Sequence, residues 1–388
     1  MCPSDSNRDS LTVNDILLQG ATTGIKLQRD DGSFSPGRNY TYDEPETPVP
    51  ITCLWLRTFT KAYKITGDSE FERAANLAVD YLIEDERRPS GFTFHCRKAE
   101  SKNKCNGLVG QAGPIWALTR AAETFDRQEA RDIAEDVFEL HPFNDQLGLW
   151  EIIEIDGSKQ SFDRTLNHQI IFAAAAANLV PESGIAERRI RQFLNNLKTN
   201  MQLHFDGLIK HYVRPPVMDM LREVARAPQT RYNMLINEAL YHYYSYSKKR
   251  KKKERGYQTV NLEALSRLRL VFKNHEFWDS TRLSDCLEYL RDNEQEIVAG
   301  INTRHGHLLP GISIAKIYDC FCDCPIKSQK RLILSDIDID DYDGKSVFEL
   351  DDVDVNTQAA LVCRLTTLPD IKLDDRENKT LQKSRRNE

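Results

Sequence analysis

The sequence predicts an all-α fold in which helical hairpins follow one another along the chain. Apolar residues recur at helical spacing, and paired helices are separated by short breaks. The first pairs start roughly 50 to 60 residues apart, which is typical of stacked hairpins. Polar clusters stand just before the first helix of successive hairpins. If the hairpins close into a ring, these loops emerge at one end. The fold class we predict is therefore an α/α toroid, a six-hairpin-like barrel with short β-hairpins in the loops at its cleft end.

The composition agrees with a soluble globular protein. The chain has 388 residues, of which 40% are hydrophobic, and its formal net charge of −6 argues against general nucleic-acid binding. No apolar run approaches the roughly 20 residues that span a bilayer. The polar stretch Met1–Asn14 lacks the apolar core of a signal peptide, so we expect a cytoplasmic location. The nine cysteines are then expected as reduced thiols.

Apolar faces define the helices in chain order. A first helix is predicted over Thr12–Leu27, and it would complete a further pair. The predicted hairpins, each a helix, a break and a returning helix, are Trp55–Tyr63 with Phe71–Leu82, Ile115–Ala122 with Ile133–Phe138, Ile170–Ala177 with Ile190–Leu197, and Leu262 onward with Arg282–Leu290.

Two segments between the hairpins alternate with period two instead. Trp150–Ile155 and Ser158–Phe162 flank Asp156-Gly157, which predicts a β-hairpin closed by a type I′ turn. Leu203–Val213 carries a weaker signal of the same kind. Short β excursions of this sort are expected where loops form a binding face.

The toroid is predicted to occupy residues 11–329. We expect disorder over residues 1–10 and an acidic, partly disordered tail over residues 330–388, which is dense in Asp at first and nearly devoid of large apolar groups at its end. The segment around Gly344 does not match a calcium-binding loop, because the first and last ligand positions of that motif fall on Ile339 and Leu350. The series Cys320, Cys322, Cys324 lacks a second cysteine pair, so no metal site is predicted.

Asp163 and His168 are the first candidates for catalysis. They flank the change from the predicted β-hairpin to the helix that carries Ile170, so both lie near a helix N-terminus. A carboxylate and an imidazole there can act as acid and base toward a sugar. The alternative is that Asp163 caps the helix and His168 faces the core. The polar neighbours Asn167 and Gln169 favour a functional role.

A second acidic group precedes the first hairpin. Asp30, Asp43 and Glu44 are candidate catalytic carboxylates, and Tyr40 and Tyr42 could stack on a sugar ring. The alternative is ordinary turn chemistry, since Asp30 begins a natural turn sequence and Glu44 precedes a proline.

Basic and polar residues before the later helices suggest that the substrate is an anion. His95, Arg97 and His211 are candidates to hold a carboxylate or phosphate, and helix N-termini at the cleft would favour the same charge. Solvated surface charge is the alternative for each. The predicted substrate-binding set, with the tyrosines above, is completed by Gln111, Trp150, Asn167 and Gln258. We expect no cofactor, and no glycine-rich nucleotide loop is visible.

Lys248–Lys253 is a nearly unbroken basic run. Most such runs are solvated helix ends. The alternative is contact with an acidic membrane surface, which would place the protein at the inner face of the membrane.

Four long motifs resemble the haloarchaeal AglQ family of Agl-cluster proteins: Gln28–Phe34, Asn39–Pro48, Asn106–Ala112 and Ser161–Gln169. The resemblance spans about residues 10 to 315. It implies a role in assembling the N-linked glycan of archaeal surface-layer glycoproteins, in connection with a hexuronic acid. It also implies a toroid similar to glycoside hydrolases, uronyl hydrolases and sugar 2-epimerases, without a settled reaction.

These observations together predict an epimerase or isomerase of a hexuronic acid precursor that is linked to a nucleotide or a lipid. Asp163 and His168 would form the acid/base pair, helped by Asp30, Asp43 or Glu44. One alternative is a hydrolase or lyase of uronosides with the same fold. Another is a non-catalytic scaffold that binds the glycan.

Overall fold

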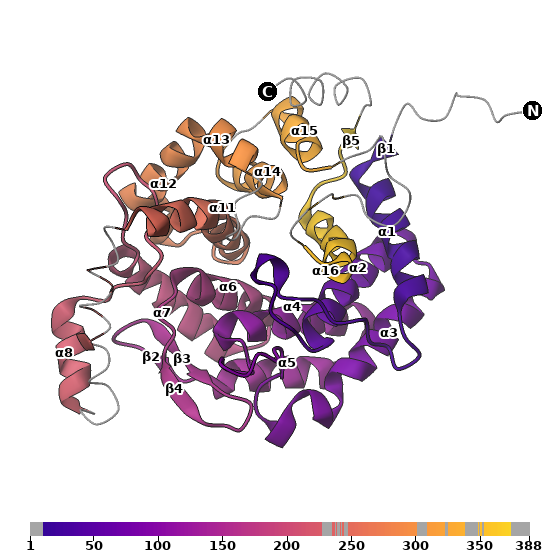
Figure 1. Cartoon of the computed structure of the whole chain (residues 1–388), viewed down its shortest axis with the longest axis horizontal. Helices are drawn as coiled ribbons and strands as arrows, with labels where there is room; N and C mark the ends of the chain where they lie inside the picture. Colours follow the sequence, from indigo (N-terminus) through magenta and orange to yellow (C-terminus); the bar gives the residue numbers. More distant parts are fainter. Residues whose placement is uncertain are drawn as a thin grey trace, which may run out of the picture.

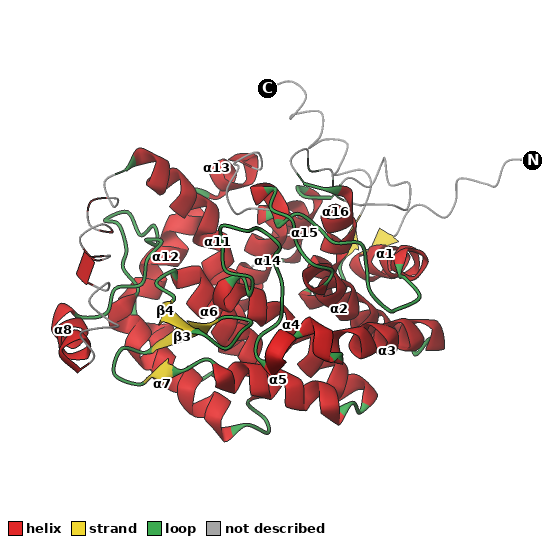
Figure 2. Ribbon diagram, turned by 60° about the horizontal axis from the view of Figure 1, so that its bottom comes forward, coloured by secondary structure: helices red, strands yellow, loops and turns green. Residues whose placement is uncertain are grey.

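The computed structural model describes residues 11–226, 247–300, 309–322, 325–337 and 353–373, with a few single positions between 235 and 243 and at 348 and 350. Its helices alternate between inner and outer positions around one axis, and Figure 1 looks onto the resulting ring. Figure 2 shows how few and short the strands are beside the helices. The predicted all-α toroid is confirmed.

The inner helices pack against one another in chain order around the axis. They are α2 (Val49–Thr66), α4 (Gly107–Phe125), α6 (Leu166–Ala176), α11 (Lys248–Val271) and α14 (Pro310–Phe321). A sixth inner element consists of α16 (Val355–Ala360) and the 3₁₀ segment η7 (Leu361–Thr367). Because η7 contacts both α14 and α2, it closes the ring within the described part of the chain.

Each of the first five inner helices is followed by an outer helix that packs on it. The outer helices are α3 (Ser69–Ile83), α5 (Gln128–Leu140), α7 (Gly184–Asn200), α12 (Thr281–Asp292) and α15 (Ile326–Leu334). The remaining helices α8 (Val217–Arg226) and α13 (Glu294–Ala299) lie in the connections. The hairpins predicted from apolar periodicity are present, and α14 with α15 adds one that the periodicity missed.

The two ends of the described chain form the sixth hairpin together. Helix α1 (Val13–Leu27) packs as an outer helix on η7, and a Cβ added to Gly20 would lie 2.5 Å from a methyl group of Val362. Strand β1 (Leu11–Thr12) pairs antiparallel with β5 (Lys372–Leu373). The Thr12 side chain accepts a hydrogen bond from the Asp15 amide, and the Asp15 carboxylate accepts one from the Thr12 amide, so α1 begins with a capping box.

The acidic tail that we predicted from residue 330 onward is wrong for the part that the structure describes. Leu361, Val362 and Leu365 are buried, and they supply the inner wall between α14 and α2. These apolar residues are few and follow a stretch dense in Asp, so average composition hid them. Residues 1–10 and 374–388, and the failed calcium loop around Gly344, lie outside the described residues.

The predicted β-hairpin is confirmed as β3 (Leu149–Ile153) paired with β4 (Lys159–Phe162), and β2 (Phe143–Asn144) extends the sheet on the other side of β3. Its turn differs from the prediction. The Gly157 amide donates to the Glu154 carbonyl at 2.9 Å, and only glycine has a positive φ, of +80°. This is a type I turn followed by a left-handed glycine, whereas type I′ needs two positive φ angles.

The weaker hairpin, Leu203–Val213, forms a single bridge between Leu203 and Ile209 rather than two regular strands. The polar stretch Gly256–Asn261, which precedes the helix predicted from Leu262 onward, lies inside α11. Helix α11 begins in the lysine run, where no apolar periodicity predicts a helix. No helix in the described ranges combines the length and apolar character needed to cross a membrane.

Candidate active site

Polar loops from distant parts of the chain meet at the end of the ring where the inner helices begin, which we call the mouth. The Tyr42 hydroxyl is hydrogen-bonded to that of Tyr257 on α11. Glu46 forms a β-bridge with Arg97. The Glu154 carboxylate at the β3–β4 turn accepts the amides of residues 104 and 105 just before α4, at 2.9 and 2.8 Å. The polar clusters that precede successive hairpins in the sequence therefore share one face of the ring.

Asp163 and His168 form a hydrogen-bonded pair at the start of α6. The His168 Nδ1 lies 2.9 Å from the Asp163 Oδ2, with the carboxylate buried and 29% of the imidazole side chain exposed. Burial acts to raise the pKa of Asp163, but the imidazole and two backbone N–H donors outweigh it and lower the pKa. The buried carboxylate orients the ring through Nδ1, and Nε2 makes no hydrogen bond to the described residues. This is the arrangement of a general base whose ring is held in place by a carboxylate.

His211 is the second imidazole of the mouth. It is 7% exposed, and its Nδ1 has no hydrogen-bond partner among the described residues. Burial, then the nearby Lys253 and His168, hold its pKa well below the usual value, so the ring is neutral at pH 7. Its backbone amide donates to Glu254 at 2.9 Å. Two imidazoles with different surroundings therefore lie within electrostatic reach of each other.

Lys253, Glu254 and Tyr257 belong to the mouth although we had not selected them. Lys253 lies over the Tyr257 ring, and burial lowers its pKa. The Tyr257 ring is 5.5 Å from that of His211. The Glu254 carboxylate, which holds the His211 amide, also lies 2.8 Å from the Nε2 of His204. Positions 253, 254 and 257 share one side of α11. Their helical spacing within the lysine-rich stretch is the sequence signal that we missed.

Glu44 lies at the mouth but is already paired. Its carboxylate accepts from Arg97 at 3.2 Å and from Lys102. Arg97 also donates to the Asn103 carbonyl at 3.1 Å, and the His95 Nε2 is 3.1 Å from the Arg97 carbonyl. These contacts hold two loops together. The contacts of Arg97 and His95 therefore have a structural role, whether or not the two side chains also contact an anionic substrate.

Glu46 is a buried carboxyl group with an unusual proton affinity. It is 5% exposed, and burial raises its pKa to about 7. Arg97 lowers this value only in part. A carboxyl group with this pKa can donate a proton near neutral pH.

Three buried glutamines clamp the loops of the mouth to the inner helices. Gln111 on α4 bonds both the amide and the carbonyl of Phe94, at 2.8 and 3.0 Å. Gln169 on α6 does the same with Trp150, at 3.1 and 2.9 Å. Gln258 on α11 accepts from the Ile209 amide at 2.9 Å. The substrate-binding roles predicted for Gln111 and Gln258 are wrong, because their polar atoms are occupied by backbone.

The other selected residues have surroundings unlike those of the Asp163–His168 pair. Trp150 is fully buried and packs on Phe138 and other core rings, so its substrate-binding role is wrong. Asp30 is exposed in a turn whose glycine packs on α3. Asp43 is exposed and paired with Arg38. Asn167 is 4% exposed beside His168, with its Oδ1 unpartnered among the described residues.

A buried cluster of charged residues lies deeper along the axis, and we call it the axial charge cluster. Its members are Arg57 on α2, Glu263 and Arg267 on α11, Lys316 on α14, and Arg364 on η7. Glu263 receives hydrogen bonds or ion pairs from Lys316 at 3.3 Å and from Arg364. The cluster thus contains four basic side chains and one carboxylate. The sequence could have indicated Arg57 as a candidate site residue, because its charge interrupts an otherwise apolar stretch of α2.

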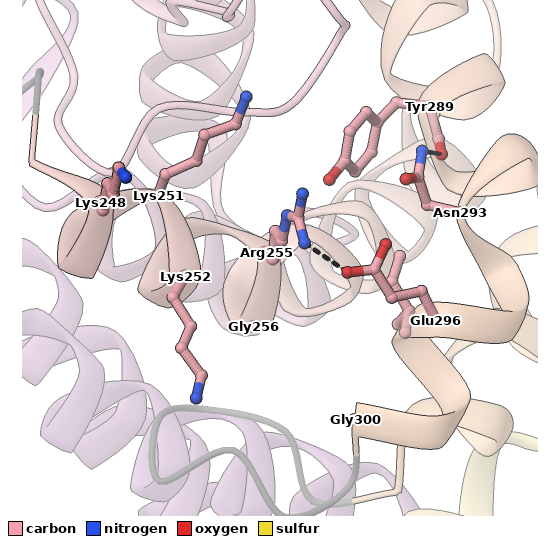
Figure 3. Close-up of a pocket in the computed structure, with 10 residues that line it drawn as sticks. Lys248, Lys251, Lys252, Arg255, Gly256, Tyr289, Asn293, Glu296 and Gly300 are labelled. Atoms are coloured by element: carbon pink, nitrogen blue, oxygen red, sulfur yellow. Dashed lines mark hydrogen bonds and ion pairs between the residues drawn. The ribbon is translucent and has the colours of Figure 1, made fainter.

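The cavity in Figure 3 lies on the outer side of α11 and measures about 370 Å³. It is lined by part of the lysine run, but Lys251 and Lys252 point in opposite directions. Lys251 pairs with Asp206 at 2.9 Å, and Arg255 pairs with Glu296. These side chains do not converge on one ligand. Membrane contact through the lysine run stays a prediction, as does the cytoplasmic location.

Within the described ranges no group of three His, Cys, Asp or Glu side chains is arranged to hold a metal ion. Cys320 and Cys322 are described, and the third cysteine of their motif lies outside the described residues.

Comparison with known proteins identifies the family. No protein-family model matches the chain. A curated protein of Haloferax volcanii named archaeal glycosylation protein Q (AglQ) is 36% identical over 369 residues, which cover 93% of this chain and 99% of that protein. This chain belongs to the AglQ family. The family resemblance seen in the sequence motifs is thereby confirmed, and the AglQ relative ties the chain to a glycosylation pathway.

Solved structures of the same fold act on carbohydrates. The cellobiose 2-epimerase of Bacillus thermoamylovorans is 13% identical with a TM-score of 0.59, covering 91% of this chain and 98% of that one. A D-mannose isomerase is 13% identical with a TM-score of 0.58, covering 91% and 96%. An α-1,6-mannanase of Salegentibacter, in complex with α-1,6-mannotriose, is 11% identical with a TM-score of 0.53, covering 91% and 98%. At these identities the comparisons show the α/α-toroid fold alone.

Proposed function

We propose that this AglQ-family protein is an epimerase or isomerase that acts on a hexuronic acid precursor, linked to a nucleotide or a lipid, during assembly of an N-linked glycan. The observation that carries the proposal is the Asp163–His168 pair at the mouth, with neutral His211 within electrostatic reach. The fold, shared with sugar epimerases and isomerases, supports it.

The chemistry needs a base and an acid that act on a carbon next to a carbonyl or carboxyl group. His168 is held by Asp163 through Nδ1, so its Nε2 takes the proton from that carbon. The electron pair of the broken C–H bond moves onto the neighbouring carbonyl oxygen. Return of this proton from His168 to the adjacent carbon completes isomerisation. In epimerisation, neutral His211 passes a proton from water to the opposite face of the same carbon, and His168 then releases its proton to water. Ionised Asp163 stabilises the imidazolium that forms in between.

The experiment is incubation of the purified protein with UDP-glucuronate and UDP-galacturonate in heavy water, read by mass spectrometry and NMR. We expect deuterium at the carbon next to the carboxylate of the sugar, and formation of the epimer at that carbon. Asp163→Asn and His168→Ala should abolish exchange with the fold intact. Asp156→Asn, an exposed carboxylate in the turn of the same β-hairpin, is the matched control and should exchange normally. Normal exchange in both active-site variants would end the assignment of the pair.

A uronoside hydrolase is the second candidate, and Glu46 is the observation that favours it. A carboxyl group with a pKa of about 7 can protonate a glycosidic oxygen. This candidate predicts release of free sugar without deuterium at carbon, and loss of that release in Glu46→Gln. If substrate binds but neither product nor exchange appears, the non-catalytic glycan-binding scaffold is favoured.

A further inference from the structure

The axial charge cluster contains two arginines whose guanidinium groups have no hydrogen-bond partner among the described residues. The Arg57 and Arg267 guanidinium carbons lie 3.5 and 4.3 Å from the centroid of the Trp116 ring on α4. Their Nε atoms are buried and have no hydrogen-bond partner among the described residues. No hydrogen bond or ion pair joins either guanidinium group to the described part of the chain. Each arginine therefore presents a rigid set of N–H donors to the axis.

The charge around this pair is unbalanced. Glu263 is engaged by Lys316 and Arg364, and its Oε2 also accepts from Ser313 at 2.8 Å. Glu263 also interacts electrostatically with Arg267, but its single negative charge cannot balance all four basic side chains. The cluster therefore keeps a net positive charge, which an anionic ligand would offset.

The cluster lies further along the inner helices than the residues of the mouth. Trp116 follows Gly107, whose Cα is adjacent to Asp163, by roughly 13 Å along α4. Side chains of the inner helices lean toward the helix N-termini, and hence toward the mouth. Tyr40, from the mouth loop, has its hydroxyl end buried near Arg57 and Arg364, and burial raises its pKa. Mouth and cluster are thus two levels of the same set of inner helices.

We propose that Arg57 and Arg267, stacked on Trp116, bind the carboxylate of a uronic acid substrate at the inner end of this site. The sugar would enter with its carboxylate leading, so that the nucleotide or lipid linkage remains toward the mouth. Guanidinium groups suit this task because their paired N–H donors match the two oxygens of a carboxylate. The inference rests on the proposed function for the identity of the substrate, but its test measures binding rather than turnover.

The test compares ligand pairs that differ only in the carboxylate. Isothermal titration would measure the binding of UDP-glucuronate against UDP-glucose, and of free glucuronate against glucose. We expect the wild-type protein to bind the uronate at least tenfold more tightly than the neutral partner in one or both pairs. Arg57→Gln and Arg267→Gln should remove that preference while leaving affinity for the neutral sugar unchanged. Arg188→Gln, at an exposed arginine on the outer helix α7, is the matched control and should keep it.

Lysine variants keep the buried charge and serve if a glutamine variant fails to fold. Arg57→Lys or Arg267→Lys should still weaken uronate binding at least threefold, because the two-pronged geometry is lost. The inference is overturned if the wild type shows no uronate preference in either pair, or if folded variants retain the preference. Uronate binding that depends on both arginines, without deuterium exchange, would support the anion site and overturn the proposed reaction instead.

Discussion

Replacement of Glu46 by glutamine should stabilise the protein at pH 8 and change little at pH 4.5. Glu46 is 5% exposed, and burial raises its pKa from 4.5 to about 7. A carboxyl group with a raised pKa in the folded state stabilises the fold below its unfolded pKa of 4.5, and this contribution is lost as the pH rises through 7. The shift corresponds to about 3 kcal/mol, at about 1.4 kcal/mol per pKa unit.

Glutamine has nearly the same shape and stays neutral at every pH. It also keeps an oxygen that can accept the Asn39 amide hydrogen bond. The free energy of unfolding of Glu46→Gln should therefore exceed that of the wild type by up to about 3 kcal/mol at pH 8, and the difference should shrink toward zero at pH 4.5.

Urea unfolding at several pH values between 4.5 and 8 measures this difference. Glu44→Gln is the control with the opposite sign, because Glu44 is paired with Arg97 and Lys102 and its loss should destabilise the protein at neutral pH. A Glu46→Gln variant that is no more stable than the wild type at pH 8 would refute the reasoning. So would a stability difference that does not change with pH.

Three further outcomes are expected. The pKa of Asp163 is lowered in the folded state, so its contribution to stability is present above pH 3.8 and is lost as the pH falls further. The difference in the free energy of unfolding between wild type and Asp163→Asn should therefore narrow below pH 4. Gln111→Ala and Gln258→Ala should each cost about 2 to 4 kcal/mol in urea unfolding, because buried backbone groups lose their partners, while the exposed Gln19→Ala should cost almost nothing. Deletion from residue 353 onward should abolish a single sharp thermal transition by opening the ring, whereas deletion of residues 374–388 should leave the melting temperature unchanged; equal effects of the two deletions would contradict the closure by η7 and β5.

The sequence alone was sufficient for the repeating part of the fold. Helix periodicity is a local property, so pairs such as α2 with α3 and α4 with α5 can be predicted from apolar spacing. The Asp163–His168 pair could be selected for a related reason, since five residues across a strand-to-helix change bring the two side chains together. The β3–β4 hairpin is equally local, although its turn type was not settled by Asp156-Gly157.

Only the tertiary structure decided which polar residues face a ligand. Gln111, Gln258 and Trp150 looked like site residues because they stand beside the mouth loops, yet their partners are backbone groups or core rings. Conversely, Arg57 and Arg267 are separated by most of the chain and meet only because α2 and α11 both contribute to the inner ring. Closure by the two chain ends is also non-local. Short-range patterns specify helices, whereas the charge on the axis depends on which helices the ring places opposite one another.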